Sequence, residues 1–277
     1  MRLAGSTAFF TTFALPPILL ILIQLLGLLF NRRKISGELF QRLAGFLGSG
    51  TVHELVNTLS GLRHLAYNWP IAIGGFLFML FVATTLFKVI QSSINQLWMI
   101  RRTGQHRFGM ALRSRLKSAL VIVFSGILFI ASLLAESLQI LLGKYVSEVL
   151  PDTGSIYFNN VVSILLSVLV VWIWITVLFR YLPDGKPGWK IAMTGAMITS
   201  LFFNAGKYLL RVLLINSNIS TLYGTSASIV LLLLFVFYSS FIFYYGAAFT
   251  KVWSEYRNQP IETLPNATLY EYADVKT

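Results

Sequence analysis

Six long apolar stretches, separated by short charged connections, fill most of this 277-residue chain. They lie at Thr7–Phe30, Trp69–Ile90, Leu116–Leu142, Phe158–Leu182, Trp189–Ile215 and Thr225–Lys251. Each reaches or exceeds the roughly 20 residues that a helix needs to cross about 30 Å of hydrocarbon, at a rise of about 1.5 Å per residue. No soluble fold needs so many segments of this length, so the sequence predicts an all-α, polytopic membrane bundle of six transmembrane helices.

The composition leaves no room for a sizeable soluble domain. Hydrophobic residues make up 56% of the chain and charged residues 12%, which is typical of a polytopic membrane protein. We therefore expect one transmembrane domain over residues 1–252 and a cytoplasmic tail over residues 253–277. The first apolar stretch is too long for a signal peptide and contains Pro16 and Pro17, so it is predicted to be a retained helix.

The distribution of positive charge predicts the orientation. The formal net charge is +12, and the connection Arg101–Lys117 holds six basic residues and no acidic one. Because positive residues beside span ends mark the cytoplasmic side, this connection should lie inside, and counting outward places both termini in the cytoplasm. The connection Asn31–Asn68 then lies outside, although it carries five basic residues.

That external connection has a helical pattern of its own over residues 35–66. Apolar residues recur at helical spacing from Ile35 to Leu62, and Gly48, Ser49 and Gly50 divide the segment in two. We expect two short amphipathic helices between the first two spans. Amphipathic stripes are more common as packing surfaces than as lipid-recognition surfaces, so capping of the bundle or packing at the interface is favoured over direct lipid recognition.

Polar residues inside the apolar stretches are the candidates for a functional path, because such residues are costly in a membrane. They are Glu136, Gln139, Asn204, Lys207, Arg211 and Lys88. Helical spacing puts the first two on one face of the third span, and the next three on one face of the fifth. By depth, Glu136 should meet Lys207 or Arg211 in the outer half of the membrane. That pair is either a structural lock or the lining of a polar cavity.

Lys88 has a different setting, near the cytoplasmic end of the second span. A snorkelling lysine is the favoured interpretation there. If Lys88 instead faces inward, the polar stripe that follows it, from Gln91 to Gln96, is a candidate cytoplasmic mouth. Small residues, among them Gly195 and Gly206 in the fifth span and Gly246 in the sixth, predict close helix contacts.

Nothing in the sequence predicts catalysis, a cofactor or a metal site. His53, His64 and His106 are scattered over opposite sides of the membrane, and the chain has no cysteine. A metal-dependent nuclease needs clustered histidine and carboxylate ligands, and neither a P-loop nor a nucleophile elbow is present. Asp152 and Asp184 lie in proline-containing turns, where an aspartate usually caps backbone N–H groups. We expect no enzymatic activity and no nucleic-acid partner.

Three segments carry a family resemblance. They are "LFVATTLFKVIQSSINQLWMI", "LPDGKPGWKIAMTGA" with "LFFNAGKYLL", and "STLYGTSASIVLLLLFVFYSSFIFYYGAAF". Their order and spacing resemble the YihY/virulence factor BrkB family, from about Ser6 to Val252. The resemblance implies a six-helix bacterial inner-membrane protein, usually described as a transporter. Members were once labelled ribonuclease BN, an assignment later regarded as mistaken.

The chain departs from the family pattern in two places. The usual cytoplasmic N-terminal stretch is missing, which questions whether Met1 is the complete start. Asn204 stands where many members carry an acidic residue, which weakens a proton-relay role at that position.

Two classes of function remain. The first is a transporter or lipid-handling protein for an anionic or amphiphilic substrate, with membrane lipids as partners. The second is a non-transporting scaffold in cell-envelope assembly or integrity, whose buried ions only lock the bundle. Inverted repeats would favour a transporter, but the two halves of the chain show no convincing duplication.

Overall fold

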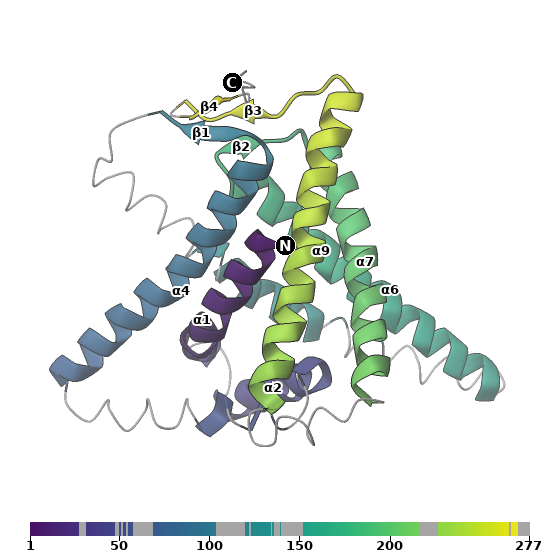
Figure 1. Ribbon diagram of the computed structural model, residues 1–277. Coiled ribbons are helices and arrows are strands. Elements are labelled where there is room, and N and C mark those ends of the chain that lie inside the picture. The colour runs from purple at the N-terminus through teal and green to yellow at the C-terminus, as the bar shows by residue number, and fades with distance from the viewer. Residues whose placement is uncertain are drawn as a thin grey trace.

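The chain folds into long helices with short strands gathered at one end (Figure 1). The computed structural model describes residues 1–27, 32–47, 50, 52–53, 55–57, 69–103, 120–121, 123–133, 135, 139, 152–215, 227–265 and 267–270. The helices are α1 (Arg2–Gly27), α2 (Arg32–Leu47), α4 (Trp69–Leu97), α6 (Asp152–Tyr181), α7 (Trp189–Ile215) and α9 (Ala227–Tyr256). The strands are β1 (Ile100–Arg102), β2 (Gly185–Lys186), β3 (Glu262–Thr263) and β4 (Ala267–Leu269).

Within these described residues, three helical segments are long and apolar enough to cross a membrane. They are Arg2–Ile23, Asn160–Tyr181 and Ile229–Tyr256. The predicted helical membrane bundle is therefore confirmed in this coarser form. The full count of six spans stays a prediction, because α4 and α7 are not among these three segments and much of the third predicted span lies outside the described residues.

The long helices follow one another around a ring. Helix α1 packs along α4 and α9, and α7 packs along α9 and α6. The helical residues at 120–133 lie between α4 and α6. Val121 shares a buried cluster with Phe87 of α4 and Leu178 of α6, and Trp174 Nε1 donates a hydrogen bond to Ser125 Oγ at 2.8 Å. The ring therefore closes through this segment, which places the faces of six helical segments toward a shared interior.

Helices α7 and α9 approach each other most closely through a reciprocal glycine–threonine contact. A Cβ built at Gly195 would overlap the Thr250 side chain, and one built at Gly246 would overlap Thr199. Each threonine hydroxyl donates to the glycine carbonyl four residues before it on its own helix, at 2.6 Å in α7 and 2.7 Å in α9. The close helix contacts predicted for Gly195 and Gly246 are present, and small residues allow them because backbones can approach directly.

At the strand end, residues from distant parts of the chain form one core. β1 pairs antiparallel with β4, and β2 pairs antiparallel with β3. The fully buried Trp98 donates from Nε1 to the carbonyl oxygen of Ala247 at 2.8 Å. Ile261 and Ala267 join the same buried cluster as Trp98. The prediction of an all-α fold missed these two ladders, which are too short to give a period-two pattern.

The segment expected to be a cytoplasmic tail therefore has a defined place. Helix α9 continues to Tyr256, and residues 261–269 run back across the ends of the other helices (Figure 1). The boundary expected at residue 252 lies inside α9.

Helix α2 lies at the opposite end of the bundle from the strands (Figure 1). It ends at Leu47, directly before the predicted break at Gly48. Leu39 is buried in a cluster with Leu19 of α1 and Leu232 of α9. This contact packs α2 against the bundle, and the capping role of the amphipathic segment stays a prediction. The external location of α2 stays a prediction, and most of the second amphipathic stretch lies outside the described residues.

Candidate functional site

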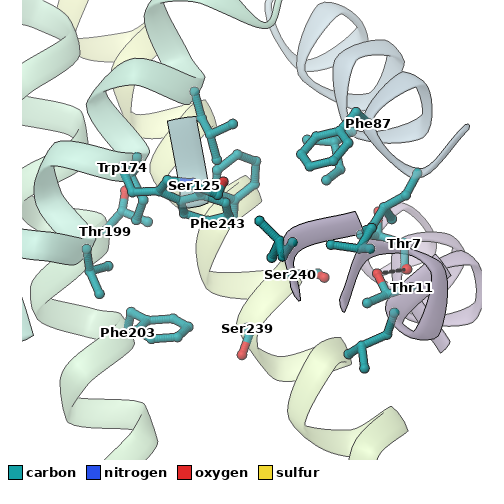
Figure 2. Close-up of a pocket in the computed structure, with 18 of the residues that line it drawn as sticks. Thr7, Thr11, Phe87, Ser125, Trp174, Thr199, Phe203, Ser239, Ser240 and Phe243 are labelled. Carbon is teal, nitrogen blue, oxygen red and sulfur yellow. Dashed lines mark hydrogen bonds between the residues drawn. The ribbon is translucent and has the colours of Figure 1, made fainter. Parts of the chain in front are cut away.

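The interior of the ring holds a cavity of about 410 Å³. Its lining comes from α1, α2, α4, α6, α7, α9 and the segment at 120–133. Figure 2 shows large apolar side chains around it, including Phe87, Trp174, Phe203 and Phe243. Its volume falls within the range of small-molecule sites, roughly 300–1,000 Å³.

Hydroxyl groups are the polar component of the labelled lining. They belong to Thr7, Thr11, Ser125, Thr199, Ser239 and Ser240. Several of these hydroxyls are bound to their own helix: Thr11 donates to the Thr7 carbonyl at 2.7 Å, and Ser125 donates to the Val121 carbonyl at 2.8 Å. Thr7 shares a 2.6 Å hydrogen bond with the Tyr244 hydroxyl. With these hydroxyls engaged, the cavity presents mainly hydrocarbon, which suits an apolar guest rather than a small hydrated ion.

A polar cluster lies one helical turn beyond this cavity, between α6 and α7. Ser167 Oγ donates to Asn204 Oδ1 at 2.8 Å, and Lys207 Nζ donates to Ser167 Oγ at 3.2 Å. Asn204 Nδ2 also donates to the Ser200 carbonyl at 2.9 Å. Lys207 and Asn204 are both half-buried. We call Ser167, Asn204 and Lys207 the α6–α7 polar cluster.

The cluster continues two rows of side chains that line the cavity. On α7, Thr199 and Phe203 line it, and Lys207 is the next residue at a spacing of four. On α6, Val171 lines it, and Ser167 is four residues before. A spacing of four residues covers about 6 Å along a helix and keeps side chains on one face. The cluster therefore lies at the end of the cavity farther from the strands.

The structure brings two of the predicted path residues together, Asn204 and Lys207, through Ser167. Gln139 is half-buried on its helix, and Lys88 is half-buried on α4. Glu136 and the Arg211 side chain lie outside the described part of the chain, so the predicted Glu136 pairing stays a prediction. Ser167 is the residue that the sequence did not single out. The observation that could have pointed to Ser167 is its position four residues before Val171, which places both side chains on one face of the helix.

A second cluster of polar side chains is buried at the strand end of the bundle. Asp184 is buried, and its carboxylate accepts from Asn95 Nδ2 at 2.6 Å and from Gln91 Nε2 at 3.2 Å. The Asp184 backbone N–H donates to Asn95 Oδ1 at 2.9 Å, and its carbonyl accepts from the Leu264 N–H at 2.9 Å. We call Gln91, Asn95 and Asp184 the strand-end latch.

The latch involves residues of two earlier predictions, the capping role of Asp184 and the conditional cytoplasmic mouth. Asp184 was expected to cap backbone N–H groups, and the structure adds two side-chain donors of α4 to its carboxylate, which the sequence did not predict. Gln91 and Asn95 were part of the conditional cytoplasmic mouth. The structure has both side chains buried and hydrogen-bonded to Asp184, and the conditional mouth stays a prediction. Asn95 lies 89 residues before Asp184, so sequence spacing could not predict that the two side chains would bond.

Metal-ligand geometry does not arise among the residues that the structure describes. No group of three or more histidine, cysteine, aspartate or glutamate side chains comes together there. His53 is exposed, and His64 and His106 fall outside the described residues.

Comparison with known proteins gives matches along most of the chain. The profile of the family described as "Virulence factor BrkB" matches residues 1–269. A UPF0761 membrane protein of Psychromonas ingrahamii is 24% identical over 268 residues, which cover 92% of this chain and 83% of that protein. A UPF0761 membrane protein of Stenotrophomonas maltophilia is 22% identical over 263 residues, 94% of this chain and 58% of that protein.

A shorter match adds a named relative. The UPF0761 membrane protein YihY of Salmonella newport is 27% identical over 181 residues, which cover 65% of this chain and 58% of that protein. The chain thus spans 58% of the length of two of these three relatives. No solved structure matches the chain.

Proposed function

The chain belongs to the virulence factor BrkB family, as its motifs predicted, and from this premise we propose that it is a lipid-handling protein of the bacterial inner membrane. Its similar relatives are described as membrane proteins. In the proposed arrangement all six spans cross the membrane, both termini lie in the cytoplasm, and an amphiphilic molecule enters the ring of helices.

The apolar cavity is the observation that carries this proposal. A space of about 410 Å³ lined mainly by leucine, isoleucine and aromatic side chains gives an acyl chain van der Waals contacts like those of the bilayer interior. A path for a small anion would need polar groups along its wall to replace the hydration shell. Four hydroxyls of the described lining already form hydrogen bonds within the protein; they belong to Thr7, Thr11, Ser125 and Thr199.

Filling the cavity tests the proposal. We expect Ser239→Phe to slow the transbilayer movement of a short-chain fluorescent phospholipid in proteoliposomes by at least about tenfold, because the large ring occupies space that the acyl chain needs. Ala205→Phe is the matched control, since Ala205 is exposed on α7 and its side chain does not line the cavity. Movement would be followed by chemical bleaching of the outer-leaflet fluorophore.

The scaffold alternative predicts a different result. The glycine–threonine contact joins α7 to α9, and the strand-end latch joins α4 to the connection after α6. A scaffold also requires such contacts. If proteoliposomes containing the wild-type protein move the lipid no faster than empty liposomes, lipid movement is excluded and the scaffold is favoured.

We also propose that the protein has no nuclease activity and no nucleic-acid partner. A hydrolytic metal site needs three or more converging ligands, and no group of three histidine, cysteine, aspartate or glutamate side chains comes together in the part of the chain that the structure describes. Incubation of purified protein with tRNA and Mg²⁺, Mn²⁺ or Zn²⁺ should leave the tRNA intact. Degradation that co-purifies with the protein through two columns would contradict this prediction.

A further inference from the structure

We propose that Arg257 and Trp253, at the end of α9, bind the phosphate of an anionic phospholipid in the membrane leaflet beside the strands. The site lies on the outer surface of the bundle, and neither residue lines the central cavity. The inference goes beyond the proposed lipid-handling function, because a lipid held here anchors the protein in its membrane whether or not the cavity takes up a chain.

Three aromatic rings stack along the last turns of α9. The ring centre of Trp253 lies 6.0 Å from that of Phe249 and 5.6 Å from that of Tyr256, with angles of 16° and 25° between the ring planes. The Arg257 guanidinium carbon lies 5.1 Å from the centre of the Trp253 ring, which is within the range of a cation–π interaction. Tyr256 and Arg257 are exposed, and Trp253 is half-buried. The stack therefore holds a positive charge at the surface of the protein.

The indole N–H of Trp253 differs from those of other tryptophans. Three other indole N–H groups donate to oxygen atoms of the protein; they belong to Trp98, Trp172 and Trp174. Trp253 Nε1 has no such acceptor among the residues that the structure describes. An indole N–H and a guanidinium can only donate hydrogen bonds, so together they suit an anion rich in acceptors. A phosphate oxygen accepts charge-assisted hydrogen bonds of this kind.

The positive charge of Arg257 is not cancelled by a carboxylate in the described part of the chain. Glu255, the acidic residue nearest in sequence, pairs with Lys251 at 3.0 Å, and Arg257 forms no ion pair in that part. Lys190, exposed on the first turn of α7, adds a second positive charge at this end of the bundle. A zwitterionic headgroup brings its own cation, which these charges oppose. The site should therefore favour a headgroup with a net negative charge.

The site lies at the level of a membrane–water interface. Helices α7 and α9 run in opposite directions and meet where Gly195 fits against Thr250. Six residues, about 9 Å of helix, separate this contact from Trp189 on α7 and from Tyr256 on α9. Trp189 is exposed, and the Arg180 guanidinium carbon lies 5.4 Å from its ring centre. Two aromatic–arginine pairs thus occupy one level, and tryptophan, tyrosine and basic residues are typical of the headgroup region.

An apolar surface continues from the stack toward the middle of the membrane. Tyr245, Phe249 and Trp253 follow one another at a spacing of four, which keeps them on one flank of α9. Tyr245 and Phe202 of α7 are both exposed, and their rings pack edge-on with centres 5.8 Å apart. A phospholipid with its phosphate on Arg257 therefore has an aromatic surface for its acyl chain. Free phosphate gains nothing from that surface, so a lipid is the favoured ligand.

Quenching of Trp253 fluorescence tests the inference, because bromine atoms near the headgroup end of an acyl chain quench a ring that they contact. The protein in neutral detergent receives phosphatidylglycerol or phosphatidylcholine with identical brominated chains. The Trp253 signal is the difference between the protein and its Trp253→Phe variant, which keeps a ring beside Arg257. We expect half-maximal quenching at about fivefold lower mole fraction for phosphatidylglycerol, the effect of about one basic residue at an anionic surface.

Variants assign the preference to Arg257. Arg257→Gln should abolish it and should fold like the wild type, because Arg257 is exposed. Arg257→Lys should keep part of the preference, because the charge remains while the paired donors of the guanidinium are lost. Arg101→Gln is the matched control, since Arg101 is exposed at the same end of the bundle, in β1. It removes the same charge from a different element and should leave the preference unchanged.

Inorganic phosphate separates a lipid from a free anion as the ligand. At matched ionic strength it should not relieve the quenching by phosphatidylglycerol any more than chloride does; greater relief would show a site for free phosphate and overturn the lipid assignment. Equal quenching by the two phospholipids, an absence of quenching, or a preference that survives Arg257→Gln would also contradict the inference. If Arg101→Gln removes the preference as fully as Arg257→Gln, the attraction comes from the charge of the whole strand end, and the proposed site is wrong.

Discussion

At the scale of single residues, the strand-end latch shows how a carboxylate can be buried at the junction of three chain segments. Asp184 receives side-chain hydrogen bonds from α4 and a backbone hydrogen bond from Leu264. Two amide donors satisfy the carboxylate, and the amide oxygen of Asn95 satisfies the Asp184 N–H. Buried polar groups of this kind cost little when bonded and much when left without a partner.

Removal of the Asn95 side chain should therefore lower the free energy of unfolding. Asn95→Ala deprives both the Asp184 carboxylate and its backbone N–H of a hydrogen bond, so we expect the free energy of unfolding to fall by about 3 kcal/mol. Thermal unfolding in detergent, followed by intrinsic fluorescence, measures the loss.

Gln96→Ala is the matched control for this prediction. Gln96 is the next residue of α4 and is exposed, so its removal should change stability by about 0.5 kcal/mol or less. Equal stability of Asn95→Ala and Gln96→Ala would show that the latch contributes nothing.

A second prediction at this scale concerns Glu136 and Lys207. Matching depths predict a contact, in which opposite charges favour each other's ionised form within about 4–6 Å. Loss of one partner of a fully buried pair costs about 3–5 kcal/mol, and less where a partner is half-exposed, as Lys207 is.

We therefore expect Glu136→Gln to destabilise the protein more than the double variant Glu136→Gln/Lys207→Gln. Unfolding measurements on the two single variants and the double variant close the cycle. Strictly additive effects would mean that the two side chains do not interact.

At the scale of elements, helices α7 and α9 are fitted to each other by residue size. The threonine of each helix occupies the space that a side chain on the other helix's glycine would need. Gly206 is fitted in the same way, because a Cβ there would overlap the Tyr238 ring. These contacts explain why the pair can pack closely along much of its length.

Gly246→Ala should force α7 and α9 apart. The new methyl group would overlap Thr199, and overpacking of this kind costs about 1–3 kcal/mol. Combination with Thr199→Ala should recover part of the loss, because it removes two of the three overlapping atoms. Thermal unfolding of the single and double variants checks both expectations.

Glycines in open space provide the control. A Cβ at Gly5 or Gly37 would meet no atom within 4 Å, and alanine is favoured over glycine in a helix by about 1 kcal/mol. Gly5→Ala and Gly37→Ala should be neutral or stabilising. A Gly246→Ala variant that matched them would show that the α7–α9 contact tolerates a side chain.

The elements were largely predictable, and their partners were not. The apolar stretches at Trp189–Ile215 and Trp69–Ile90 predicted α7 in full and most of α4, because apolar runs of membrane length have few alternatives. Gly195 and Gly246 were recognised as packing residues. The reciprocal threonines were not, since a threonine in an apolar helix has no sequence signature that separates a contact from lipid exposure. Short strands such as Gly185–Lys186 depend on a partner far away in sequence.

At the scale of the whole molecule, α4, α6, α7 and α9 each have one end at the strands. The same four helix ends lie on the cytoplasmic side in the predicted orientation, which itself stays a prediction. The candidate site could be predicted only in part from sequence. Asn204 and Lys207 stood out as polar residues in an apolar helix, but the cavity beside them depends on which helices close the ring.

Cysteine labelling tests the orientation in this cysteine-free chain. Lys186→Cys, at the exposed position in β2, should react with a membrane-impermeant maleimide only after the cytoplasmic side is opened. Asp152→Cys, at the start of α6, should react in intact spheroplasts. The reverse pattern would show that the protein has the opposite orientation.

The pairing of β3 and β4 with the loops after α6 and α4 also sets an order of events during synthesis. Residues 261–265 and 267–269 leave the ribosome after every helix described here, yet they supply Ile261 and Ala267 as neighbours of Trp98, and the Leu264 N–H that binds the Asp184 carbonyl. Before these residues are made, Trp98, the Asp184 carbonyl and the strands β1 and β2 lack these partners. Burial of these groups is therefore completed only after α9 has been synthesised.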